Sequence, residues 1–222
     1  MALINNSHKF IFIHIPKAAG TSITKALSKF NQTGDFEIRD GKIDEEVKKK
    51  LGIRKHSSAL EIIEALGIET WKDYYTFSFV RHPYDRAISI YRFLKFQFKS
   101  WEGFEVMESF KNINDFIESE FFQTEGPDKI FLNQTYWLKD PDNSLVLVDF
   151  IGRFEHLDRD FYKVESKIAT RHRFRNMFKK VKLKHQNKTD GGDVHFNELN
   201  EKSKSILQER YAEDFREFDY QY

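Results

Sequence analysis

The sequence predicts an α/β fold: a P-loop-like parallel sheet with helices on both faces. Two runs, residues 9–15 and 74–80, are short, apolar and rich in β-branched and aromatic side chains, which is typical of strands buried on both faces. A polar turn and a helical pattern follow each run. Strands that alternate with helices form parallel sheets, and a third strand is expected at residues 145–150.

Helical patterns fill most of the remaining chain. Ser58, with Glu61 three residues later, has a capping-box pattern, and Gly67 marks the end of that helix. The expected helices cover residues 22–30, 42–51, 58–66, 83–98, 112–122, 158–170 and 197–217. The length of 222 residues suits one core, and no repeat or Pro/Gly-rich hinge divides it, so a single domain over residues 1–222 is expected.

The composition excludes several classes of site. The 36 basic and 35 acidic residues nearly balance, so no global field indicates nucleic acid or a membrane as a partner. The absence of cysteine excludes disulfides, thiolate metal sites and a cysteine nucleophile. The histidines are scattered without an HExxH pattern, so no metal is expected. The first apolar run is too short for a membrane span and lacks the order of a signal peptide, which favours a soluble cytoplasmic protein.

The first expected strand leads into a loop that suits an anion, residues 14–22 with the sequence HIPKAAGTS. Backbone N–H groups at a helix start converge on phosphate, and the helix dipole adds partial positive charge. Gly20 lets the backbone approach a ligand, and Thr21 and Ser22 add hydroxyl donors. Lys17 can neutralise charge on a bridging oxygen, but it does not directly precede the hydroxyl residue as in a Walker A loop. An ordinary strand-to-helix turn is the alternative.

The second expected strand repeats this arrangement in the segment FSFVRHPYDRAISIY, residues 77–91. Arg81 is expected at the carboxyl end of the strand, where open α/β sheets bind ligands. Its guanidinium can bind a phosphate through two hydrogen bonds. Ser89, about two turns into the next helix, offers a further phosphate contact. The alternative is a salt bridge for Arg81 and a helix-packing contact for Ser89.

Together the two segments resemble the carbohydrate-type sulfotransferases, including the heparan 2-O-sulfotransferase-like and bacterial sulfotransferase family 2 members. Residues 14–22 are similar to their 5′-phosphosulfate loop, and residues 77–91 to their 3′-phosphate element. Weaker similarity continues in IGRFE at residues 151–155 and in KHQNKT at residues 184–189, which is similar to a loop that closes over the nucleotide. The resemblance implies the sulfotransferase fold.

The resemblance also implies a donor, 3′-phosphoadenosine 5′-phosphosulfate, and the residues that bind it without a metal. The expected donor-binding residues are Lys17, Ala18, Ala19, Gly20, Thr21 and Ser22 at the phosphosulfate, Arg81 and Ser89 at the 3′-phosphate, and Lys188 and Thr189 over the nucleotide. The chain departs from the family at Ala18 and Ala19, where a Thr-Gly or Gly-Gly pair is common. It also departs at His82, where an acidic or amide residue is usual.

Sulfuryl transfer, like phosphoryl transfer, mainly requires positioning and charge stabilisation. Lys17 is expected to stabilise the leaving oxygen. The attacking hydroxyl needs a base, and we favour His56, which precedes a helix between the two phosphate elements, where the family places its base. Glu155 is the second candidate, as base or as orienter of the base. The alternatives are a surface position for His56 and a salt bridge for Glu155, and His14 is expected to be a packed histidine with a backbone hydrogen-bond partner.

The acceptor is expected to be a hydroxyl-bearing glycan or other small molecule, on the resemblance alone. Residues 171–184 carry seven basic residues and no acid, and they are either a solvated segment or an attraction for an anionic acceptor. Aromatic side chains such as Trp101, Phe104, Tyr136 and Trp137 could stack on sugar rings, although core packing explains most of them.

Two other functions stay open. A P-loop kinase or NTPase would use Mg-ATP, and residues 144–149, SLVLVD, resemble a Walker B strand in which Asp149 helps to hold the metal. A non-catalytic nucleotide- or glycan-binding module would bind the nucleotide without turnover.

Overall fold

A computed structural model describes residues 2–32, 36–37, 51–142, 145–171 and 196–222. The chain forms two compact units. The sheet unit consists of Met1–Val80 and Tyr136–Gln186, and the helical unit of Arg81–Thr135 and Asn187–Tyr222. The single domain expected over residues 1–222 stays a prediction. Most of the helix expected at residues 42–51 lies outside the described residues.

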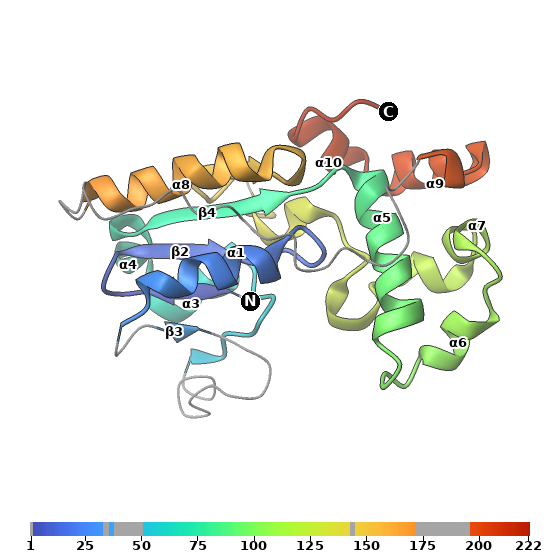
Figure 1. Cartoon of the computed structure of the whole chain (residues 1–222), viewed down its shortest axis with the longest axis horizontal. Coiled ribbons are helices and arrows are strands. Elements are labelled where there is room, and N and C mark those ends of the chain that lie inside the picture. Colours follow the sequence, from blue (N-terminus) through green and yellow to red (C-terminus); the bar gives the residue numbers. More distant parts are fainter. Residues whose placement is uncertain (1, 33–35, 38–50, 143–144, 172–195) are drawn as a thin grey trace. The chain divides into compact units, whose positions relative to one another are not determined.

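The sheet unit is built on a five-stranded mixed sheet with the order β3-β1-β2-β4-β5 (Figure 1). The strands are β1 (Leu3–Asn5), β2 (Phe10–Ile13), β3 (Phe36–Glu37), β4 (Tyr75–Val80) and β5 (Phe150–Arg153). Strands β2, β4 and β5 run parallel, whereas β1 is antiparallel to both β2 and β3. The prediction of a parallel sheet is therefore correct for β2, β4 and β5 and wrong for β1 and β3.

The parallel strands end at one edge of the sheet. Ile13 pairs with Ser78, and Val80 pairs with Arg153, so the carboxyl ends of β2, β4 and β5 lie together. The Ser78 hydroxyl donates a hydrogen bond of 2.8 Å to the Ile13 carbonyl, which ties the end of β2 to β4. This edge carries the loops that the sequence predicts to bind anions.

The strand expected at residues 145–150 is wrong in its position. Leu145 is 60% exposed, and regular pairing with β4 begins only at Phe150. Before it, the Asp149 carboxylate accepts hydrogen bonds from the Thr76 N–H at 2.8 Å and the Thr76 hydroxyl at 3.0 Å. Residues 145–149 therefore form a connection before β5, and Asp149 at the end of this connection is hydrogen-bonded to Thr76 of β4.

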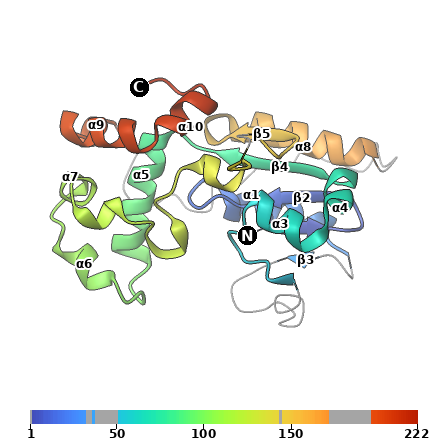
Figure 2. The ribbon, with the colours of Figure 1, turned by 180° about the vertical axis from the view of Figure 1, so that it is seen from behind.

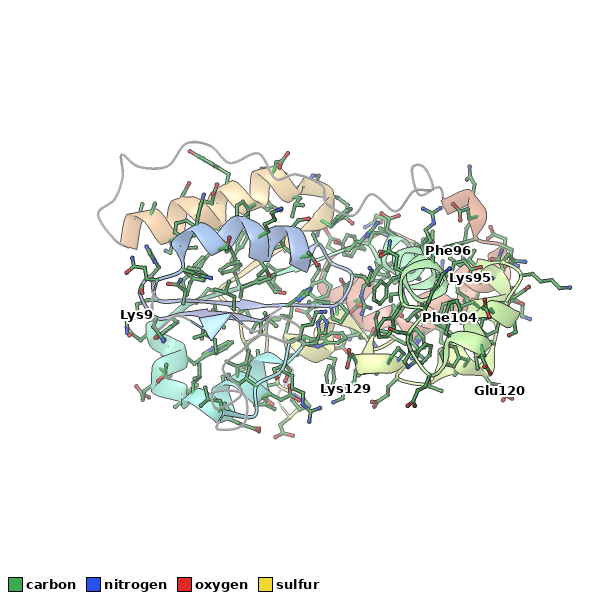
Figure 3. All side chains as sticks on the ribbon, turned by 60° about the horizontal axis from the view of Figure 1, so that its bottom comes forward. Lys9, Lys95, Phe96, Phe104, Glu120 and Lys129 are labelled. Carbon is green, nitrogen blue, oxygen red and sulfur yellow. The ribbon has the colours of Figure 1, made fainter. Side chains whose placement is uncertain are left out.

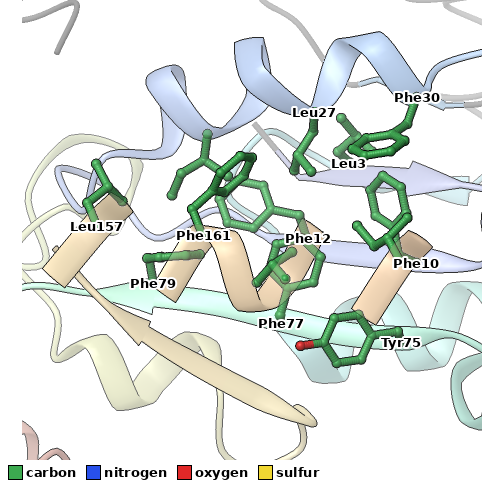
Figure 4. Close-up of a cluster of buried hydrophobic side chains, with 13 residues drawn as sticks. Leu3, Phe10, Phe12, Leu27, Phe30, Tyr75, Phe77, Phe79, Leu157 and Phe161 are labelled. Carbon is green, nitrogen blue, oxygen red and sulfur yellow. The ribbon is translucent and has the colours of Figure 1, made fainter. Parts of the chain in front are cut away.

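Helices cover both faces of the sheet. On one face α1 (Gly20–Leu27) and α8 (Leu157–Arg171) enclose a core in which Phe12 and Phe77 stack with ring centroids 5.4 Å apart (Figure 4). The other face carries α3 (Ala59–Leu66) and α4 (Ile68–Asp73), which come forward when the ribbon is seen from behind (Figure 2).

The capping box predicted at the start of α3 is confirmed. The Ser58 hydroxyl accepts the Glu61 N–H at 3.2 Å, the Glu61 carboxylate accepts the Ser58 N–H at 2.8 Å, and Gly67 follows the last residue of the helix. The reciprocal bonds fix the N-cap of this helix at Ser58, two residues after His56. The segment that carries the candidate base therefore ends at a well-defined point.

The helical unit contains short helices around an aromatic core. Its elements are α5 (Pro83–Arg92), the π-helix η2 (Phe93–Gln97), α6 (Phe104–Ser109), α7 (Ile113–Ile117), η3 (Glu120–Gln123), η4 (Pro127–Lys129), η7 (Phe196–Glu198), α9 (Glu201–Arg210) and α10 (Ala212–Glu217). The single helix expected at residues 197–217 is two helices that meet at the buried Tyr211, whose hydroxyl donates to the Phe131 carbonyl at 3.1 Å. Phe116, Phe122 and Phe131 pack edge-on or tilted, with centroids 5.1–5.6 Å apart.

Gly152 in β5 lets the core of the sheet unit close. A Cβ atom at this position would lie 2.4 Å from the ring of Phe79. We expect Gly152→Ala to lower the free energy of unfolding by about 1–3 kcal/mol, since the ring must shift in a packed core. Urea denaturation measures this change.

The same substitution in a Phe79→Leu background is the matched control. The smaller side chain makes room for the new methyl group, so Gly152→Ala should cost less there. Equal costs in the two backgrounds would show that the contact with Phe79 is not the cause.

Candidate functional site

The loop after β2 holds two non-glycine residues in the left-handed region. Lys17 has φ 66° and Ala19 has φ 67°, a conformation that costs each residue on the order of 1 kcal/mol. Ala19 is the N-cap of α1 and makes no side-chain capping bond. The helix thus starts at Gly20, two residues earlier than the sequence predicts, with the N–H groups of its first turn available to an anion.

Gly20 is required by a protein contact, apart from any role in ligand binding. A Cβ atom there would lie 1.7 Å from Cδ2 and 1.8 Å from Nε2 of the His14 ring, so the imidazole packs directly against the glycine. His14 is 4% exposed, in accord with its predicted packing role. Its Nδ1 is buried without a hydrogen-bond partner among the described residues.

The other predicted phosphosulfate ligands divide by exposure. Thr21 is exposed, and Lys17, Ala19 and Ser22 are partly exposed. Ala18 is 2% exposed. The methyl group of Ala18 belongs to the core, so this residue can offer a ligand little besides its backbone.

His56 lies beside the start of this loop. Its ring is tilted against that of His14, with centroids 4.5 Å apart, and its Nδ1 is 2.9 Å from the His14 carbonyl oxygen. Because a carbonyl only accepts, Nδ1 carries the hydrogen and Nε2 is the basic nitrogen of the neutral ring. The Trp137 Nε1–H donates to the His56 carbonyl at 3.0 Å and holds the backbone. The structure thus brings His56 to the predicted anion loop.

Glu155 lies at the same sheet edge but farther along it. It is exposed in the short helix η6 (Phe154–His156), directly after β5, and β4 separates β5 from β2. The Arg153 N–H donates to the buried Asp160 carboxylate at 3.1 Å. Burial alone would raise the pKa of Asp160, but its hydrogen bonds with Arg159, Arg153 and Lys163 together lower it below the ordinary value. This edge of β5 is therefore well anchored.

Arg81 opens the helical unit and is held through its backbone. Its N–H donates to Gln134 Oε1 at 2.9 Å, and its carbonyl accepts from Gln134 Nε2 at 2.8 Å. Ser89 lies partly exposed on α5. The sequence analysis did not identify Gln134. The signal available for it is the polar pair Asn133 and Gln134, which interrupts the largely apolar residues 130–138.

His82 accounts for one departure from the family pattern. It is the N-cap of α5: Nδ1 accepts the Tyr84 N–H at 3.3 Å, and Nε2–H donates to the Gln221 carbonyl at 3.0 Å. The acidic and amide residues usual at this position are good N-caps for the same reason, a side-chain acceptor. The histidine keeps the capping function.

Other predicted positions cannot be compared with the structure. Lys188 and Thr189, with the rest of residues 184–189, lie outside the described residues, as does nearly all of the basic run at residues 171–184. Lys17 and His56 lie in the sheet unit, whereas Arg81 and Ser89 belong to the helical unit, and each set is described within its own unit.

The Walker B interpretation of Asp149 is not supported by its place in the sheet. Asp149 precedes β5, and its carboxylate already accepts two hydrogen bonds from Thr76. It therefore lies near the amino ends of β4 and β5, whereas Lys17 follows the carboxyl end of β2. A metal-binding aspartate would need to face the phosphate loop.

The described part of the chain has neither a cluster of metal ligands nor a membrane-spanning helix. It contains no group of three or more His, Cys, Asp or Glu side chains placed to hold a metal ion. None of its helices combines the length and the apolar character needed to cross a bilayer.

The fold is that of an α/β protein in which a strand, a loop and a helix form a candidate anion site. The particular family follows from comparison: the chain matches the sulfotransferase family over residues 1–221 and belongs to it. The resemblance seen in the sequence is thereby confirmed. No curated protein and no solved structure gives a significant match.

The capping role of His82 can be measured directly. His82→Ala removes the acceptor for the Tyr84 N–H and should lower the free energy of unfolding by about 0.5–2 kcal/mol. His82→Asp restores an acceptor and should lose less. Thermal unfolding of both variants gives the comparison, and equal losses would contradict the capping role.

Proposed function

We propose that this chain transfers a sulfuryl group from 3′-phosphoadenosine 5′-phosphosulfate to a hydroxyl of an acceptor, for which a carbohydrate is the favoured class. Membership of the sulfotransferase family supports sulfuryl transfer. The assignment of the donor is supported by the loop before α1. In this loop Lys17 and Ala19 adopt the left-handed conformation, and the helix that follows has no side-chain cap at its N-terminus.

The loop suits the 5′-phosphosulfate. N–H groups at the start of α1 and the side chains of Thr21 and Ser22 supply donors around an anion. Lys17 supplies the positive charge that opposes the charge growing on the leaving oxygen. The close packing of His14 on Gly20 keeps this helix start at a fixed distance from β2.

Arg81 and Ser89 are assigned to the 3′-phosphate. Val80, the residue before Arg81, ends β4 at the edge where β2 also ends. A guanidinium that follows this strand is suited to two-pronged phosphate binding. Lys188 and Thr189 remain proposed residues of a segment that closes over the nucleotide.

His56 is proposed as the base. The acceptor oxygen forms a bond to sulfur while the bond from sulfur to the phosphate oxygen breaks, and the hydroxyl proton passes to Nε2 of His56. The hydrogen bond from Nδ1 to the His14 carbonyl supports this role because it fixes both the tautomer and the ring. Glu155 remains the second candidate, as a base or as a residue that orients the base.

Nucleotide titration tests the donor assignment. Adenosine 3′,5′-bisphosphate should bind without a divalent metal, and Lys17→Ala should weaken that binding and reduce turnover by about 10²–10³-fold. Isothermal titration and a sulfuryl-transfer assay with labelled donor and a panel of glycans measure the two effects.

The control is Lys9→Ala, at the opposite end of β2. Lys9 forms an exposed ion pair of 2.9 Å with Asp73 and should be dispensable (Figure 3). Tight binding of Mg-ATP without binding of the bisphosphate would favour the kinase instead. Bisphosphate binding without turnover on any acceptor would favour the non-catalytic module.

A second prediction separates catalysis from binding at His56. His56→Asn keeps a side-chain donor for the His14 carbonyl but has no basic nitrogen. It should retain donor affinity and lose turnover by about 10²–10⁴-fold, together with the acid limb of the kcat–pH profile in the range where histidines titrate. An unchanged pH profile in the variant would move the base to another residue, with Glu155 tested next.

A further inference from the structure

The buried carboxamide of Gln134 forms hydrogen bonds with both the N–H and the carbonyl of Arg81, as the backbone of a neighbouring β-strand does. It accepts the Arg81 N–H at 2.9 Å and donates to the Arg81 carbonyl at 2.8 Å. Gln134 is 0% exposed. Both backbone polar groups of one residue are thus satisfied by a single side chain, which fixes the peptide planes on both sides of it.

Gln134 is itself held by the last helix. The carboxylate of Asp214, in α10, accepts the Gln134 N–H at 2.8 Å and the Thr135 N–H at 3.0 Å, and it lies 3.3 Å from Gln134 Nε2. Burial raises the pKa of Asp214, while the charge of Arg86 and these N–H donors act in the opposite direction. The carboxamide of Gln134 therefore has only one rotational setting that satisfies all its partners.

The segment in front of Gln134, residues 130–132, accepts hydrogen bonds from a side chain of α5 and from Tyr211, which directly follows α9. The fully buried guanidinium of Arg86 donates at 2.9 Å to both the Ile130 and the Leu132 carbonyls. The Phe131 carbonyl accepts the Tyr211 hydroxyl at 3.1 Å. Three successive carbonyl groups are thereby fixed, and the segment cannot shift along its length without leaving buried polar groups unpaired.

We propose that Gln134, oriented by Asp214, is a positioning residue that sets the direction of the Arg81 side chain toward the 3′-phosphate of the donor. This inference rests on the proposed function, which assigns that phosphate to Arg81. The direction of a side chain depends on the backbone dihedral angles of its residue. A fixed Arg81 backbone therefore restricts the positions that the Arg81 guanidinium can reach. The affinity for the 3′-phosphate then depends on a residue that does not touch it.

The test compares two nucleotides on the same protein. The ratio of the affinities for adenosine 3′,5′-bisphosphate and adenosine 5′-monophosphate reports the 3′-phosphate alone, and the fraction of unfolded protein cancels from it. Gln134→Glu keeps the shape and the acceptor but removes the donor to the Arg81 carbonyl. It should lower the ratio by about tenfold, the effect of roughly one lost buried hydrogen bond. Gln134→Met, which removes both bonds, should lower the ratio at least as far and replaces Gln134→Glu if that variant does not fold.

Two controls distinguish positioning from general loosening. Ser203→Ala removes another hydrogen bond of the helical unit, from the buried Ser203 hydroxyl to the Glu118 carboxylate at 3.3 Å, and it should leave the ratio unchanged because it touches neither Arg81 nor the segment in front of Gln134. In an Arg81→Ala background, where the guanidinium is absent, Gln134→Glu should lower the ratio no further. Additive effects of the two substitutions would overturn the proposal.

The failures are distinguishable. A wild-type ratio near one would overturn the assignment of the 3′-phosphate in the proposed function, and this inference with it. A wild-type ratio well above one that Gln134→Glu leaves intact would overturn this inference alone. An equal fall in Ser203→Ala would assign the effect to stability and would also overturn it.

Discussion

The parallel pairing of β2 with β4 is the constraint on which the sheet unit depends. It brings the carboxyl ends of both strands to one edge of the sheet, and the hydrogen bond from the Ser78 hydroxyl to the Ile13 carbonyl holds the two strands in register there. Each of the two strands is followed by a polar turn and then by a helix. The same aromatic side chains that bury one face of these strands, such as Phe12 and Phe77, therefore also position the loops.

The junction after β2 combines packing and chemistry in a few atoms. The His14 ring occupies the space that a side chain at residue 20 would need, and the His14 carbonyl orients His56. His14, which contacts no ligand in the proposed mechanism, thus connects the proposed phosphosulfate loop with the proposed base. This explains why the two can hold a fixed relation although 42 positions separate His14 and His56 along the chain.

Sequence reasoning found what local patterns encode. The strands predicted at residues 9–15 and 74–80 are observed at residues 10–13 and 75–80, and the capping box at Ser58 is confirmed, because each has a signal within about ten residues. The misplaced strand at residues 145–150 failed because an apolar run does not reveal that Asp149 binds Thr76, 73 positions away. Gln134 was missed for the same reason: its role is defined by Arg81 and Asp214, which lie 53 and 80 positions from it.

The left-handed alanine at position 19 has a consequence for how the loop meets its ligand. Glycine is common here in the family and would adopt the same conformation without strain, but it would also adopt many others. Alanine has fewer alternatives, so in the proposed function less conformational entropy is lost when the phosphosulfate binds at the start of the helix. The strain at Ala19 is present once the chain has folded, so the loop would already be preorganised for the proposed nucleotide.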